Sequence, residues 1–433
     1  MAILDTGPLD NRDNPRTTQL AIRLLNTGRT PAIAGIEVYH VDPTSNGFNS
    51  QTLYAVNLVS LNPFGTPGSG FTVDNIFANL DVFGVRVITS GLGANDIAAT
   101  VLERGSTGQI IHEHVLEGEL SRIEELLFAY AIQGNSTVSV INTGTNTVVA
   151  TVTLPAGSGS VGIAITPDGS RAYVTNFNNN TVSVINTGTN TVAATVILPA
   201  GSGPNLIAIT PDGSRAYVTN VSNSTVSVIN TGTNTVVATV TLPAGSLPVG
   251  IAITPDGSLA YVANQGNSTV SVINTGTNTV VATVPLPAGS GPVGIAITPD
   301  GSRAYVVNFN NSTISVINTG TNTIMATVTL PAGSNPSEIA ITPDGSRAYV
   351  ANTGNSTVSV INTGTNTIMA TVTLPAGSNP IGIAITPDGS RAYVTNNGNS
   401  TVSVINTENN TVVATLPVGM SPGVIAITPI LLF

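Results

Sequence analysis

Few residues in this sequence are of types that could catalyse a reaction or bind a metal. One cluster is His112-Glu113-His114, and on a strand His112 and His114 would point to one face. Two imidazoles at this spacing can share a metal ion, with His40 as a possible third ligand. No acidic residue is clearly on that face, so an ordinary solvated strand is the expected alternative. We predict no metal and no cofactor, and name these three histidines as the candidates for a metal site.

Six aspartates recur at one position of a repeated Thr-Pro-Asp-Gly turn. They are Asp168, Asp212, Asp256, Asp300, Asp344 and Asp388. A ring of them on one face could bind cations, but Asp is also a residue that such turns favour. Arg follows three residues later in five of the six copies, and Leu259 breaks the series. Neutralised Asp–Arg pairs therefore favour a structural role.

From residue 126 onwards the chain has no His, Cys or Lys. It therefore offers no imidazole base and no thiol or amine nucleophile. Its acids beyond the turn aspartates are Glu338 and Glu408. The repeats are almost uniform and no insertion interrupts them. We predict no catalytic residue and no enzymatic activity for this part of the chain.

The composition argues against some classes of binding partner. Only 8% of the 433 residues are charged, the net charge is −10, and every basic residue is Arg. Nothing makes a basic patch, which argues against nucleic acid as a partner. No segment approaches the ~20 apolar residues of a membrane helix. After Met1 only three apolar residues precede Asp5, so the N-terminus does not have the pattern of a signal peptide.

Internal repeats dominate the sequence. Tyrosines recur every 44 residues from Tyr173 to Tyr393, and Tyr130 precedes them by 43. Each unit holds four short runs rich in Val, Ile and Thr, separated by Gly, Asn and Pro turns, which is typical of a propeller blade. We assign the Ile-Ala-Ile-Thr run to the innermost strand, where crowding favours small residues. We expect the recurring tyrosine to pack between blades, with its hydroxyl reaching a partner.

The two ends of the array predict that the ring is closed. The array begins near residue 126 without an Ile-Ala-Ile-Thr strand and ends with one at 424–428. Residues 126–433 are thus predicted to form a seven-bladed β-propeller in which strand 424–428 completes the first blade. Closure removes the exposed edges of an open array, which is the alternative architecture.

The region before the propeller has no visible repeat but also has strand patterns. Residues 17–120 are predicted to form a small β-sandwich or jelly-roll-like domain. Residues 1–16 are predicted to be an unpaired arm, and 121–125 a linker. The arm is either a disordered terminus or a segment that adds a strand to a neighbouring subunit.

The segments Ala-Tyr-Val-Thr-Asn, Ser-Val-Ile-Asn and Gly-Ile-Ala-Ile-Thr-Pro-Asp-Gly-Ser-Arg-Ala-Tyr-Val resemble the YVTN family of β-propeller repeats. The resemblance covers about 300 residues, and it implies a surface-layer, cell-surface or spore-surface protein. Some related propellers are lactonase-like enzymes. We recognise no family for the N-terminal domain.

We therefore predict a non-enzymatic structural or binding protein at the cell or spore surface. Its expected partners are other surface-layer proteins, or itself through the N-terminal domain, and glycans. Two alternatives stay open. One is a lactonase-like or other metal-dependent propeller enzyme, and the other is a glycan-binding adhesin. The near-absence of propeller aromatics outside the tyrosines gives the adhesin little to stack on a sugar.

Overall fold

The computed structural model describes residues 127–429 in full and, before them, the backbone of nine strands between Ala2 and Leu116. The chain divides into two compact units, Met1–Glu125 and Leu126–Leu431. All described regular structure is β, and no helix in the described residues could span a membrane. The prediction of an all-β chain is confirmed for the propeller.

The first unit contains two antiparallel sheets. Its strands are β1 (Ala2–Asp5), β2 (Leu9–Asp10), β3 (Gln19–Asn26), β4 (Ala32–Val41), β5 (Gln51–Leu61), β6 (Gly70–Phe77), β7 (Val82–Ser90), β8 (Ile97–Arg104) and β9 (Ile110–Leu116). One sheet has the order β1-β7-β4-β5, with β2 also on β7, and the other has the order β6-β3-β8-β9. Strands β1 and β2 lie in the segment predicted to be an unpaired arm. The sandwich or jelly-roll assignment stays a prediction.

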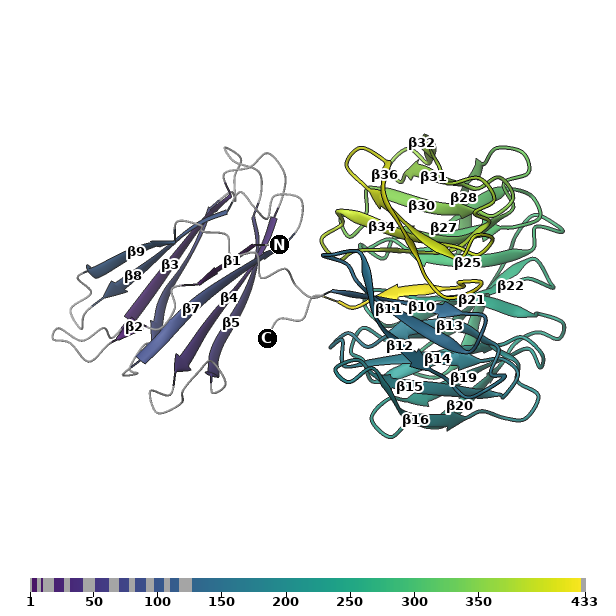
Figure 1. Cartoon of the computed structure of the whole chain (residues 1–433), viewed down its shortest axis with the longest axis horizontal. Coiled ribbons are helices and arrows are strands. Elements are labelled where there is room, and N and C mark those ends of the chain that lie inside the picture. The colour runs from purple at the N-terminus through teal and green to yellow at the C-terminus, as the bar shows by residue number, and fades with distance from the viewer. Residues whose placement is uncertain are drawn as a thin grey trace. The chain divides into compact units, whose positions relative to one another are not determined.

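The second unit is a seven-bladed β-propeller (Figure 1), as the repeats predicted. Six blades are continuous in sequence, each with four antiparallel strands in chain order. Their innermost strands are β13 (Ser160–Ile165), β17 (Pro204–Ile209), β21 (Pro248–Ile253), β25 (Pro292–Ile297), β29 (Pro336–Ile341) and β33 (Pro380–Ile385). The second strands are β14 (Arg171–Asn176), β18 (Arg215–Asn220), β22 (Leu259–Asn264), β26 (Arg303–Asn308), β30 (Arg347–Asn352) and β34 (Arg391–Asn396).

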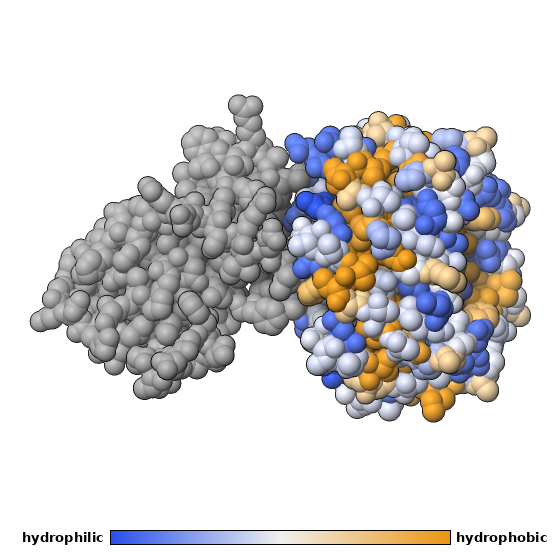
Figure 2. All heavy atoms as spheres, in the orientation of Figure 1, coloured by the Kyte–Doolittle hydropathy of each residue, from blue (hydrophilic) through white to orange (hydrophobic). Residues whose placement is uncertain are grey.

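The third and fourth strands complete each sheet outwards. The third strands are β15 (Thr181–Asn186), β19 (Thr225–Asn230), β23 (Thr269–Asn274), β27 (Thr313–Asn318), β31 (Thr357–Asn362) and β35 (Thr401–Asn406). The fourth strands are β16 (Thr191–Ile197), β20 (Thr235–Thr241), β24 (Thr279–Pro285), β28 (Thr323–Thr329), β32 (Thr367–Thr373) and β36 (Thr411–Pro417). The fourth strands leave apolar residues such as Val237 and Met325 exposed, and Figure 2 shows apolar patches on the propeller surface.

The remaining blade joins both ends of the array. It contains β37 (Ile425–Ile427), β10 (Phe128–Gln133), β11 (Thr137–Asn142) and β12 (Thr147–Thr153), in the order β12-β11-β10-β37. In Figure 1 the C-terminal yellow strand lies beside β10, and Tyr130 is in register with Ala426. The C-terminal strand therefore closes the ring as predicted.

The apolar core lies between successive blades. Each cluster combines the tyrosine and the valines of one blade with the inner face of the next, as Tyr173, Val184 and Val218 do. All seven tyrosines are fully buried. The Tyr173 hydroxyl donates to Thr231 O (3.1 Å) or to Asn234 Oδ1 (2.7 Å) of the next blade. Burial raises the pKa of Tyr130, Tyr261 and Tyr393 to about 12, so these hydroxyls stay protonated. The predicted packing of the tyrosines is confirmed.

Candidate functional site

The turn aspartates lie on one face of the propeller, and each caps its own turn. Thr210 Oγ1 donates to Asp212 Oδ1 at 2.5 Å, and the Ser214 amide and hydroxyl donate at 3.0 and 2.8 Å. These bonds stabilise the carboxylate and lower the pKa of Asp212 to about 2, with the Thr210 bond the largest cause. The charge is thus satisfied within the five residues from Thr210 to Ser214.

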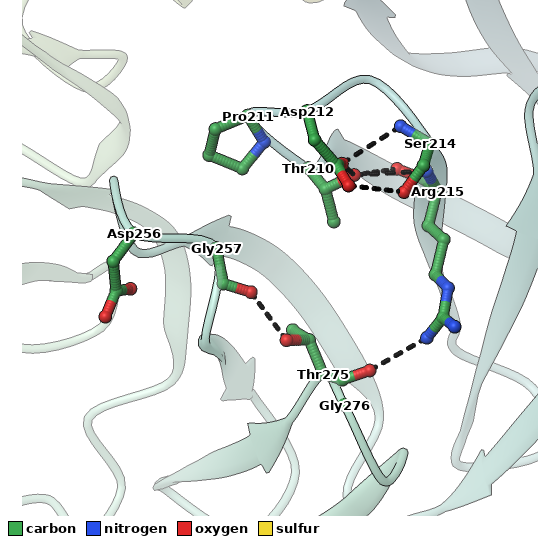
Figure 3. A pocket seen from close by; sticks show the side chains of 9 residues that line it. All are labelled: Thr210, Pro211, Asp212, Ser214, Arg215, Asp256, Gly257, Thr275 and Gly276. Carbon is green, nitrogen blue, oxygen red and sulfur yellow. Dashed lines mark hydrogen bonds between the residues drawn. The ribbon is translucent and has the colours of Figure 1, made fainter.

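A cavity of about 530 Å³ lies beside this turn, between Asp212 and Asp256 (Figure 3). The expected Asp–Arg pairing is not the arrangement found there. The Arg215 guanidinium points away from the turn and donates to Thr275 O of the next blade at 2.9 Å. The same bond to the next blade is made by Arg171, Arg303 and Arg347. The aspartates and arginines therefore have structural roles, in the turn and between blades respectively.

The three candidate histidines lie on two different sheets. His112 and His114 are on β9, opposite Glu103 and Val101 of β8. His40 is on β4, opposite Thr52 and Phe83. Their side chains are outside the described residues, so the metal site stays a prediction. Among the described residues, no three His, Cys, Asp or Glu side chains gather as metal ligands.

The opposite end of the central channel has a second pocket, of about 260 Å³, which we call the channel-mouth pocket. Every blade contributes at least one lining residue, so the pocket lies on the propeller axis. Its walls come from the beginnings of the innermost strands and from the residues that follow β22 and β26. The polar lining residues are Asn205, Gln265, Ser337 and Glu338, and the other seven are apolar.

The sequence departs from its repeat at this pocket. Four of the seven blades carry Gly at one position of this inner segment, as at Gly250, Gly294 and Gly382, where the next blade comes close, and the other three carry Leu206, Glu338 and Val424. A Cβ on Gly250 would lie 2.0 Å from Val293 O. At the equivalent position β29 carries Glu338. A carboxyl group thus occupies a place where the other blades have glycine or an apolar side chain.

Glu338 is held by local backbone and by the preceding blade. Its Oε1 accepts a hydrogen bond from the Ile339 amide at 3.2 Å. A Cβ on Gly294 of the preceding blade would lie 2.9 Å from that oxygen, so the glycine leaves the space in which the carboxyl group lies. Desolvation by the surrounding protein raises the pKa of Glu338 to about 7, and the Ile339 amide opposes this rise. Near neutral pH the group is therefore balanced between acid and base.

The Ser337 side chain has a structural role, because it links two neighbouring blades. Its Oγ donates to Ile381 O of the next blade at 2.8 Å. In two other blades the hydroxyl groups of Thr175 and Thr219 donate to a carbonyl of the next blade in the same way. The residue of β30 at the threonine position is Ala351, so Ser337 supplies the hydroxyl that β30 lacks. Glu338 is then the one titratable residue that lines the channel-mouth pocket. The chemistry open to it is proton transfer, assisted by the amide groups of Asn205 and Gln265.

The comparisons with known proteins decide the family. A family model described as "Lactonase, 7-bladed beta-propeller" matches residues 130–279 and 252–417, about two-thirds of the chain. The chain belongs to this lactonase family. No curated protein sequence matches the chain.

Solved structures share the fold of this lactonase-family propeller at low sequence identity. A gluconolactonase of the Pseudomonas aeruginosa periplasm is 18% identical, with a TM-score of 0.60 over 70% of this chain and 99% of that one. A putative 6-phosphogluconolactonase from Bacteroides fragilis gives the same identity, TM-score and coverage. Hydrazine synthase from Kuenenia stuttgartiensis is 24% identical, with a TM-score of 0.57 over 62% and 89% of the two chains. These likenesses show the fold alone.

The family match corrects two predictions from the sequence. The prediction of a non-enzymatic surface-layer protein is wrong, because the matching family is that of lactonases. The prediction of no enzymatic activity is wrong for the same reason, and the lactonase-like alternative is the better one. The missed residue is Glu338. Its signal was present as Pro-Ser-Glu-Ile-Ala-Ile, because the other copies have Gly, Leu206 or Val424 in place of the glutamate.

Proposed function

We propose that this propeller hydrolyses a lactone in the channel-mouth pocket, with Glu338 as the general base. The observation that carries the proposal is the position of Glu338, a desolvated carboxyl group at the channel mouth of a lactonase-family propeller. A general base acts best when its pKa lies near the working pH. A pKa of about 7 meets that condition, whereas an ordinary glutamate would be too weak a base.

The reaction needs one water and one proton acceptor. Glu338 takes a proton from the water while the water oxygen attacks the carbonyl carbon of the lactone. The ring C–O bond then breaks as the tetrahedral intermediate collapses. The proton held by Glu338 returns to the leaving alkoxide, giving a hydroxy acid. Asn205 and Gln265 supply amide N–H donors in the same pocket for the negative charge that develops on the carbonyl oxygen. Because the donors and the base come from different blades, only the closed ring assembles them.

Replacing Glu338 tests this proposal. We expect Glu338→Gln to lower kcat for lactone hydrolysis by about 10²- to 10⁴-fold, the usual contribution of a general base. A pH-stat assay on a panel of lactones measures the rate. Glu408→Gln is the matched control, since Glu408 lies in an exposed turn of the same propeller, and it leaves the rate unchanged. A Glu338→Gln protein as active as the wild type would refute the role of this residue.

The same assay checks the role of Glu338 through pH. A base must be deprotonated to act, so kcat/KM of the wild type rises with pH and levels off above about 7. The Glu338→Gln variant loses this inflection. A wild-type profile without an inflection near 7 contradicts the proposal.

The expected surface location and the expected assembly through the N-terminal domain stay predictions. Both are separate from the proposed catalysis, because Glu338 and its pocket lie wholly in the propeller.

A further inference from the structure

The channel-mouth pocket is polar in only a small part of its wall. Seven of its eleven lining residues are apolar, among them Val249, Val293, Phe309 and Ile381. The side chains at the mouth thus offer a hydrocarbon surface next to one carboxyl group and two amides. A wall of this kind binds a hydrocarbon group because the group is removed from water.

Cations are absent from this lining. All five arginines of the propeller begin second strands, at the far ends from this pocket, and the guanidinium groups of Arg171, Arg215, Arg303 and Arg347 bond carbonyls of the next blade. Among the lining residues Glu338 carries the only charge. A substrate with a phosphate or carboxylate group would meet this negative charge with nothing to compensate it, and such repulsion is strong where water is excluded.

The pocket is also small. Its volume of about 260 Å³ is below the ~300–1,000 Å³ of most ligand sites. One lactone ring with a short side chain fills such a space.

We propose that the substrate is a small uncharged lactone with a hydrocarbon side chain, and that phosphorylated sugar lactones are rejected. The ring ester lies against Glu338 and the amides of Asn205 and Gln265, and the side chain lies against the valines of the neighbouring blades. This inference rests on the proposed function. It also explains product release, since hydrolysis converts a neutral ligand into an anionic hydroxy acid, which the Glu338 carboxylate repels.

Three lactones with the same six-membered ring test the inference. They are δ-decalactone, glucono-δ-lactone and its 6-phosphate, and the measurement is kcat/KM for each with the whole chain. We expect δ-decalactone to be preferred over the phosphorylated lactone by about 100-fold or more, because like charges placed together cost several kcal/mol. A preference for the phosphorylated lactone would overturn the substrate class and leave the proposed function intact. Hydrolysis of none of a wider lactone panel would overturn the proposed function.

A change of charge in the wall gives an independent test. Val293→Arg places a cation in the pocket, and we expect it to shift the ratio of the two kcat/KM values towards the phosphorylated lactone by at least about tenfold. Val281→Arg is the matched control, on an exposed position of β24, and does not shift the ratio. Thermal unfolding checks that each variant folds, and Val249→Arg replaces Val293→Arg if the latter does not. An unchanged ratio in a folded variant contradicts the inference.

Binding separates the substrate class from catalysis. Calorimetry with δ-decalactam, which has an amide in place of the ester, and with the 6-phosphate of gluconolactam measures affinity without turnover. The inference predicts that only δ-decalactam binds, and that Val293→Arg weakens this binding. Tighter binding of the phosphorylated lactam would overturn the inference, whatever the activity assays show.

Discussion

Glu338 links the proposed chemistry to the stability of the propeller. Folding raises the pKa of this group from 4.5 to about 7 because it loses hydration. The native state therefore holds its proton more tightly than the unfolded chain does. The resulting stabilisation is complete below pH 4.5 and is lost as the pH rises to about 7. One pKa unit corresponds to about 1.4 kcal/mol, so the loss is about 3 kcal/mol.

This linkage predicts that Glu338→Gln stabilises the propeller at alkaline pH. The variant should have a larger free energy of unfolding than the wild type at pH 8, and this advantage should shrink by about 2–3 kcal/mol on going to pH 5. Thermal unfolding of both proteins at the two pH values measures it. The turn aspartates do not affect this comparison. Their pKa values are lowered, so the stability that they contribute is lost only at acidic pH. A pH-independent difference would show that Glu338 is not desolvated.

Gly294 leaves the space that the Glu338 carboxyl group fills. A Cβ at residue 294 would come within 2.8 Å of Ser337 O and 2.9 Å of Glu338 Oε1. We expect Gly294→Ala to cost about 1–3 kcal/mol through overpacking and to lower lactone hydrolysis about tenfold or more by displacing the base. The control is Gly188→Ala, whose Cβ meets only Asn186 Oδ1 at 3.4 Å. Unchanged activity in Gly294→Ala would show that the exact place of the carboxyl group is unimportant.

At the scale of the blade, polar links supplement the apolar packing between sheets. The tyrosine hydroxyl and the arginine guanidinium of one blade reach the same carbonyl of the next, as Tyr217 and Arg215 do at Thr275. Between β22 and the next blade the arginine is replaced by Leu259, so Thr319 O is reached by the Tyr261 hydroxyl at 3.2 Å and by no arginine. This junction lacks the arginine bond that both neighbouring junctions have.

Restoring that arginine should strengthen the junction. We expect Leu259→Arg to donate to Thr319 O and to stabilise the propeller by about 1 kcal/mol, a charged hydrogen bond less the side-chain entropy it costs. Arg215→Leu is the reciprocal change and should destabilise by a similar amount. Chemical denaturation of the two variants and the wild type measures both effects. If Leu259→Arg is neutral while Arg215→Leu destabilises, the repeat geometry is not transferable between junctions.

At the scale of the whole molecule, stability depends on closing the ring. β37 pairs with β10, and Ile425 packs in the cluster that joins the first blade to the last, with Tyr393 and Val404. The Tyr393 hydroxyl crosses the same junction to Thr143 O at 3.0 Å. Without β37 the inner edge of β10 and this cluster would be open to water.

Removing residues 424–433 should therefore destabilise all seven blades together. We expect the melting temperature to fall by about 10 °C or more, since burial of an isoleucine alone contributes about 2–5 kcal/mol. The control is removal of residues 430–433, which keeps β37 complete. Differential scanning calorimetry compares the two. A truncated chain that melts like the control would mean that the blades are stable without closure.

The sequence by itself determined the blade, the number of blades and the closure of the ring. These follow from local rules, because strand and turn preferences act over a few residues and the repeat copies them seven times. Only the tertiary structure decided where Glu338 lies and what surrounds it. On the sequence it is one of two propeller acids outside the Thr-Pro-Asp-Gly turns, but the fold brings seven innermost strands to one axis and packs protein around its carboxyl group. Proximity between residues far apart in the chain, and the desolvation it causes, cannot be read from local sequence.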